Sequence, residues 1–146
     1  MKLLSPRLRR TLLAIALVAS SLPAFAFDST TRLTNVPIQD RDVGTALSQG
    51  LTQDFEKAFP ARNYGVRVIV DGLQVGNGQE VVYISVGLAR RLPDGRHLQQ
   101  HANYSYALML PANENQSKKR EDILKTLAQV ANKFSQAVID NQSKVR

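Results

Sequence analysis

The chain has 146 residues, with 19 Lys and Arg against 12 Asp and Glu for a net charge of +7, and it contains no cysteine. The missing cysteine excludes a small disulfide-stapled scaffold, so the core must hold the fold by packing. The length suits a single domain that can bury such a core.

The first 26 residues predict a secretory signal. A basic start, which includes Lys2, precedes an apolar run over 12–19, and Ala24-Phe25-Ala26 matches the site that a signal peptidase accepts. A membrane span needs about 20 apolar residues, so we expect cleavage near Ala26 and a periplasmic or secreted product. An uncleaved N-terminal anchor is the alternative, and the lack of cysteine excludes a lipid-modified N-terminus.

Cleavage would remove much of the positive charge. Four of the 19 basic residues and none of the 12 acidic ones lie before position 27, so the remaining 120 residues carry 15 basic against 12 acidic side chains, a net charge of +3. A nucleic-acid partner, which the charge of the whole chain would favour, is therefore not expected.

Residues 27–42 lack a clear hydrophobic period, which predicts an extended lead-in. Asp40 or Asp42 is then expected to cap a helix, because a short carboxylate can accept hydrogen bonds from the free amides of the first turn. Apolar residues at steps of three and four predict that helix, which ends before Pro60, while Gly50 either weakens it or marks a close contact. Its apolar positions are Val43, Ala46, Leu47, Leu51, Phe55, Ala58 and Phe59.

The β-branched run from Val66 to Val70 predicts the first strand of a meander. Asp71-Gly72 breaks its alternation, and a bulge there would return Leu73 and Val75 to the face of the valines. Gly76-Asn77-Gly78 predicts a tight turn with positive φ into a second strand.

The stretch from Glu80 to Leu110 gives the clearest fold signal, two alternating apolar runs on either side of Pro93-Asp94-Gly95. A type I turn followed by a Gly bulge at those three residues would place Leu92 opposite Arg96, so that the numbers of paired residues sum to 188. This register puts both apolar runs on one face, whereas a slip of one residue would divide them between the two faces.

A second and stronger amphipathic helix closes the chain. Lys118-Lys119-Arg120 would oppose the helix dipole, so we expect the regular helix to begin nearer Arg120. The apolar stripe of this helix is Ile123, Leu127, Val130, Ala131, Phe134, Ala137 and Val138.

These elements predict an α+β two-layer sandwich in the order α-β-β-β-α, a three-stranded antiparallel meander with two helices on one face. We assign residues 1–26 to a cleaved signal, 27–42 to the lead-in, 43–142 to a single α+β domain and 143–146 to a frayed tail. The other sheet face is too mixed in polarity to be a core, so it is either a binding surface or covered by the lead-in. The edge strands stay open to pairing, which would allow a homodimer.

No catalytic residue, metal site or cofactor is predicted. His97 and His101 are four residues apart, which on a strand separates them by about 13 Å, too far to share a metal ion. The sequence lacks the usual motifs of nucleophilic catalysis. Ser85 and His101 could lie close together on the open face and serve a small envelope hydrolase. The simpler explanation is that Gly87, which this register places opposite His101, makes room for the imidazole ring.

Three groups of residues are candidates for binding. Arg90, Arg91, Arg96 and His97 surround the tip of the long hairpin; Lys118, Lys119 and Arg120 precede the last helix; Tyr83 and His101 lie on the open sheet face. Either basic group could meet an anionic surface such as phospholipid or lipopolysaccharide.

The main functional prediction is a non-enzymatic periplasmic interaction domain, an accessory factor that binds another envelope component through an open sheet face or edge. The alternative is an immunity or inhibitor protein that neutralises a toxin or a cell-wall hydrolase, because such a protein needs the same small scaffold and no active site.

Overall fold

The computed structural model describes residues 27–144, with the side chains in that range except those at 99–101 and 143–144. The predicted signal, residues 1–26, lies outside the described residues. The elements along the chain are β1 (Ser29–Thr34), α1 (Asp40–Gly50), α2 (Gln53–Ala58), β2 (Tyr64–Val75), β3 (Gln79–Arg91), β4 (His97–Pro111) and α3 (Gln116–Lys144).

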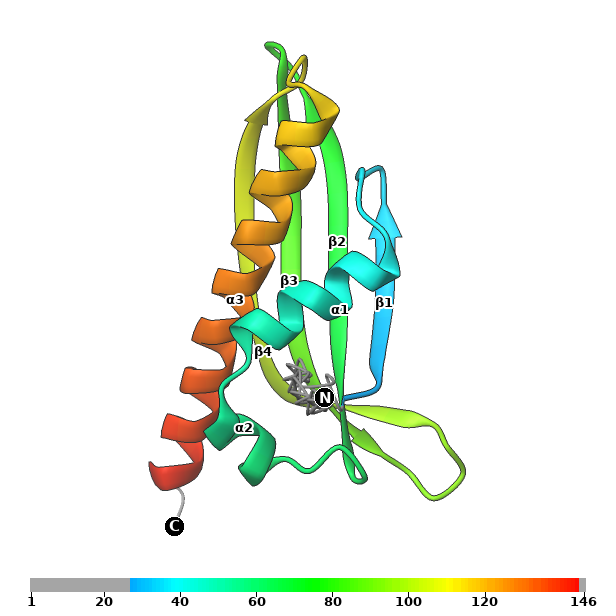
Figure 1. Cartoon of the computed structure of the whole chain (residues 1–146), viewed down its shortest axis with the longest axis vertical. Coiled ribbons are helices and arrows are strands. Elements are labelled where there is room, and N and C mark those ends of the chain that lie inside the picture. The colour runs from blue at the N-terminus through cyan, green and yellow to red at the C-terminus, as the bar shows by residue number, and fades with distance from the viewer. Residues whose placement is uncertain (1–26, 145–146) are drawn as a thin grey trace, which may run out of the picture.

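The four strands form one curled, mixed sheet in the order β1-β2-β3-β4. β1 runs parallel to β2, and the other neighbours are antiparallel. α3 lies along one face of the sheet, and α1 crosses that face between β1 and α3 (Figure 1). The predicted α+β class and the antiparallel meander of β2, β3 and β4 are confirmed.

The core lies between the helices and the even-numbered face of the sheet. Alternate residues of β2 and β3 are fully or nearly fully buried there, as the period of two predicts. The buried apolar residues of these two strands on that face are Val66, Val68, Val70, Val82, Ile84, Val86 and Leu88. β4 is the edge strand and is covered less, so Tyr106 keeps 47% of its surface exposed although it shares this face.

The prediction of a three-stranded sheet is wrong by one strand, because Ser29–Thr34 forms β1 inside the expected lead-in. Ser29 pairs with Val66 and Thr34 with Asp71, so β1 extends the sheet at the edge of β2. Phe27, just before β1, is buried with its ring centroid 5.5 Å from that of Phe55. The element order therefore begins with a strand, and the start of the described chain is anchored in the core.

The single helix predicted from Val43 to Phe59 is two helices, α1 and α2. Thr52 separates them, and its side-chain oxygen accepts a hydrogen bond of 3.3 Å from the Phe55 amide at the start of α2. Gly50 marks a close contact: an added Cβ would lie 2.3 Å from the Ala128 carbonyl oxygen on α3. Small residues thus allow α1 and α3 to approach at this point.

α3 begins at Gln116, four residues earlier than expected, and continues to Lys144. Asn115 accepts a hydrogen bond of 2.8 Å from the Ser117 amide through its side-chain oxygen, which serves the free amides of the first turn. The cations that should oppose the helix dipole are each paired with a carboxylate, so their cost is offset. The pairs are Lys118 with Asp122, Lys119 with Glu80 and Arg120 with Asp42.

The first hairpin has no bulge. Asp71 pairs with Tyr83 and Gly72 with Val82 in an unbroken register, so Leu73 stays on the face away from the helices and is 64% exposed. Gly72 occupies the covered face, where an added Cβ would lie 2.6 Å from the Asn35 carbonyl oxygen. The glycine at this position accommodates a close approach of backbone and leaves the ladder regular.

The predicted register of the second hairpin holds near its turn and then shifts by two residues. Gly95 has φ of +82°, and Arg91 pairs with His97, which agrees with the sum of 188. Beyond an irregularity between Gly87 and Ala89, the sum becomes 190, and Val86 pairs with Tyr104. Because the shift is an even number, the predicted faces of both strands are kept although the individual partners change.

Candidate functional site

The sheet face away from the helices, called the open face below, exposes apolar side chains at the end near the β2–β3 turn. Leu73 pairs with Val81, and Val81 pairs with Met109, so the three form a row across three strands. Leu73 is 64%, Met109 53% and the adjacent Tyr83 42% exposed. We call these four residues the apolar row.

Hydroxyl groups occupy the middle of the open face. The Tyr83 hydroxyl donates a hydrogen bond of 2.8 Å to Ser105 Oγ, and Ser105 donates one of 3.1 Å to Ser85 Oγ. Ser85 and Ser105 are direct cross-strand partners, and Ser85 is buried. These bonds fix Tyr83 against the sheet and leave its ring exposed.

The predicted approach of His101 to Gly87 is wrong, because Gly87 pairs with Asn103. The two-residue shift displaces His101 into the irregular part of β4, and the side chain of His101 lies outside the described set. The hypothesis of a small hydrolase therefore loses its basis, which was the expected proximity of His101 to Ser85 and Gly87.

The tip of the β3–β4 hairpin projects past the start of β1 (Figure 1). Arg91 forms an ion pair of 2.8 Å with Asp28, and His97 Nε2 lies 4.0 Å from the same carboxylate oxygen. Arg96 pairs with Asp94 at 2.6 Å inside the turn, and this hydrogen bonding lowers the pKa of Asp94. Two of the three arginines in the predicted basic tip therefore face carboxylates.

Arg90 remains exposed and lines a surface cleft of about 680 Å³. The sequence reasoning missed Arg62, which lies in the turn before β2 and joins Arg90 and Arg91 in this cleft. The other lining residues are Asn63, Tyr64, Leu92 and Pro93.

Lys118, Lys119 and Arg120 do not form one cationic surface. The Lys119 ammonium is buried 2.5 Å from Glu80 Oε2, and side-chain exposure is 9% for Lys119 and 3% for Glu80. Arg120 pairs with Asp42 at 2.7 Å, and this hydrogen bond lowers the pKa of the Asp42 carboxyl group. Lys118 points to Asp122 at 2.9 Å, which raises the lysine pKa.

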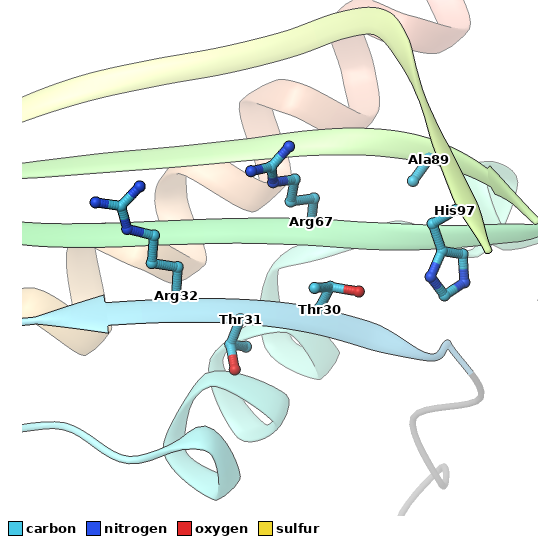
Figure 2. Close-up of a pocket in the computed structure, with 6 residues that line it drawn as sticks. All are labelled: Thr30, Thr31, Arg32, Arg67, Ala89 and His97. Atoms are coloured by element: carbon cyan, nitrogen blue, oxygen red, sulfur yellow. The ribbon is translucent and has the colours of Figure 1, made fainter.

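A cavity of about 160 Å³ lies at the other end of the open face from the apolar row. Figure 2 shows Arg32 from β1 and Arg67 from β2 pointing to the same side of the sheet. The cavity is lined by Thr30, Thr31, Arg32, Arg67, Ala89 and His97. Sequence reasoning singled out only His97 among them, because Thr30, Thr31 and Arg32 come from β1, which it did not predict.

Among the side chains that the structure describes, no three from His, Asp or Glu gather in a way that could hold a metal ion. No helix within residues 27–144 has both the length and the apolar character required to cross a bilayer.

No protein-family model and no curated protein matches the chain. Solved structures give distant likenesses. A candidate lipoprotein from Caulobacter crescentus CB15 has 12% identity and a TM-score of 0.45, with 84% of this chain and 94% of that one covered. A minor lipoprotein from Acinetobacter baumannii has 15% identity and a TM-score of 0.37, with 80% and 94% covered. A PelC dodecamer from Paraburkholderia phytofirmans has 12% identity and a TM-score of 0.32, with 75% and 89% covered. Likenesses as distant as these assign no function to the chain.

Proposed function

We propose that the chain is a non-enzymatic domain of the bacterial envelope that binds another envelope protein through the open face of its sheet. The apolar row carries this proposal. It lies on the face that no helix covers, and three of its members expose about half of their surface or more.

The arrangement of the apolar row supports a protein interface more strongly than its amino-acid composition alone does. Exposed apolar residues are common when they are scattered, but contiguous patches mark interaction sites. Leu73, Val81 and Met109 are consecutive cross-strand neighbours, and Tyr and Met are types enriched at protein interfaces. The hydrogen bond from Tyr83 to Ser105 holds the ring in place, which lowers the entropy lost on binding.

The envelope assignment rests on the sequence. The basic start, apolar run and Ala24-Phe25-Ala26 site predict export, and the cysteine-free core suits a periplasmic domain.

Site-specific photo-crosslinking in cells tests the proposal. A benzoylphenylalanine at Met109 should give a crosslink to one envelope protein, identified by mass spectrometry. The same group at Gln129, an exposed residue of α3 on the other side of the molecule, is the control and should not give it. Adding Leu73→Glu should abolish the Met109 crosslink without lowering the melting temperature, because Leu73 is largely exposed.

Equal crosslinks from Met109 and Gln129, or a Met109 crosslink that survives Leu73→Glu, would count against the proposal. A crosslink only to a second copy of the chain would replace the envelope partner with a homodimer.

A further inference from the structure

The surface cleft of about 680 Å³ beside the β3–β4 hairpin, called the tip cleft below, holds two cations without a counterion. Arg62 comes from the turn before β2 and Arg90 from the end of β3, and both side chains are exposed. Within the described part of the chain, neither side chain has a hydrogen bond or an ion pair. The described residues that line the cleft include no carboxylate. The two arginines therefore give this cleft a surplus of positive charge.

The other arginines of the hairpin are already paired. Arg91 forms its ion pair with Asp28 at 2.8 Å, and Arg96 forms one with Asp94 at 2.6 Å. The Asp94 carboxylate would otherwise repel an anionic partner, but the guanidinium beside it offsets its charge. An anion that approaches the hairpin therefore meets the two unpaired arginines of the tip cleft.

Apolar side chains adjoin these cations. Leu92 and Pro93 line the same cleft. Leu98 pairs with Arg90 across the β3–β4 ladder and is 58% exposed. The hairpin projects from the body of the molecule at the same end as the turn before β2 (Figure 1). Segments that combine exposed apolar side chains with cations bind at the surface of an anionic bilayer, because the buried apolar area and the attraction to headgroups add.

The start of the described chain points to the same partner. Asp28 pairs with Arg91, so the described chain begins beside the tip cleft. The segment before it, residues 1–26, is the predicted signal, which meets the membrane during export. A dissolved anion would satisfy the arginines and leave Leu98 in water. A phospholipid offers phosphate to the arginines and an apolar boundary to the leucine, so it accounts for both features.

We propose that the tip cleft and Leu98 dock the domain on the surface of a bilayer that contains anionic phospholipid. Arg62 and Arg90 contact the lipid phosphates, and Leu98 enters the boundary between headgroups and acyl chains. This docking is independent of the apolar row, because Val81 of the row and Arg90 are nine residues apart on β3, which corresponds to about 30 Å.

Vesicle flotation tests the proposal on the protein purified from expression of the whole chain, with the intact mass recording whether the signal has been removed. The vesicles are phosphatidylcholine with and without phosphatidylglycerol. Arg62→Gln and Arg90→Gln should each weaken binding to the phosphatidylglycerol vesicles about fivefold, as expected for one cation near an anionic surface. Leu98→Ser should weaken it about fivefold or more through lost apolar burial. All three side chains are exposed, so the melting temperatures should stay unchanged.

Two matched controls lie away from the hairpin. Lys125→Gln removes an exposed cation from α3, and Leu73→Ser removes an exposed apolar side chain from the apolar row. Each should change vesicle binding less than about twofold, because a charge more than about 10 Å from the bilayer is screened at 0.1 M salt and Leu73 does not reach it. Leu73 belongs to the proposed protein contact, so flotation and crosslinking can fail separately.

The proposal is overturned if the phosphatidylglycerol vesicles do not bind, if phosphatidylcholine alone binds equally well, or if any tip variant binds as well as the unaltered protein. It is also overturned if either control weakens binding as much as the tip variants do. Calorimetry with glycerol phosphate covers the remaining case. Binding that depends on Arg62 and Arg90 without any flotation would replace the bilayer with a dissolved anion.

Discussion

At the scale of single residues, the buried pair of Lys119 and Glu80 joins the start of α3 to the β2–β3 hairpin. Glu80 Oε2 accepts from Lys119 and also from Gln74 Nε2 at 3.1 Å, while Glu80 Oε1 is buried without a partner. Such a pair need not stabilise the fold relative to apolar residues, but breaking it on one side leaves an uncompensated charge.

Lys119→Met should therefore lower the free energy of unfolding by about 3–5 kcal/mol, because Glu80 would remain buried with only the Gln74 amide. Lys118→Met is the matched control, since that side chain is 62% exposed and its loss should change stability by about 0.5 kcal/mol or less. Urea unfolding measures both.

The double variant Glu80→Leu with Lys119→Met should recover most of the loss, because it removes both charges at once. If Lys119→Met costs no more than Lys118→Met, the buried pair does not have the role described.

At the scale of elements, the crossing of α1 and α3 depends on Gly50. An added Cβ would lie 2.3 Å from the Ala128 carbonyl oxygen and 2.7 Å from Ala131 Cβ, whereas at Gly44 in the same helix nothing lies within 4 Å. Substitutions at the two glycines therefore separate the effect of helix propensity from the effect of the contact between α1 and α3.

Gly50→Ala should destabilise the protein by about 1–2 kcal/mol, since the overpacking at backbone atoms outweighs the gain in helix propensity. Gly44→Ala should stabilise it by about 0.5–1 kcal/mol. Thermal melting of the two variants would show opposite shifts, and shifts of the same sign would contradict a tight crossing at Gly50.

The sequence predicted those elements whose own residues carry a period. β2, β3 and β4 alternate between faces, and Gly95 marks the turn with its positive φ. β1 was missed because it contains one apolar residue, Leu33, and gains its place by pairing with β2. The break at Thr52 had a local signal, a threonine that can cap a helix, but the continuous apolar stripe of α1 and α2 obscured it.

At the scale of the whole molecule, the sheet divides the chain into a side packed against the helices and an open side. Tyr83 could be placed on the open face from its position in β3, because the period of two fixes the face without any knowledge of partners. Arg32 and Arg67 could not be brought together in the same way, because their proximity requires the register of β1 with β2. The basic cluster Lys118-Lys119-Arg120, in the first turns of α3, was predicted from proximity in sequence, whereas the partners of Lys119 and Arg120 come from β3 and α1.

The two-residue shift in the β3–β4 ladder has a consequence for deletions. Removing Gln99 and Gln100 together would restore one continuous register from Arg91 to Gln79, with every remaining side chain on its present face. Removing Gln100 alone would move the side chains of either the hairpin tip or the rest of β4 to the opposite face of the sheet. We expect the larger deletion to melt at a higher temperature than the smaller one, and the reverse order would contradict the observed pairing. By the same rule, homologous chains should differ in length at this point of β4 in steps of two residues, so that insertions and deletions here come in pairs.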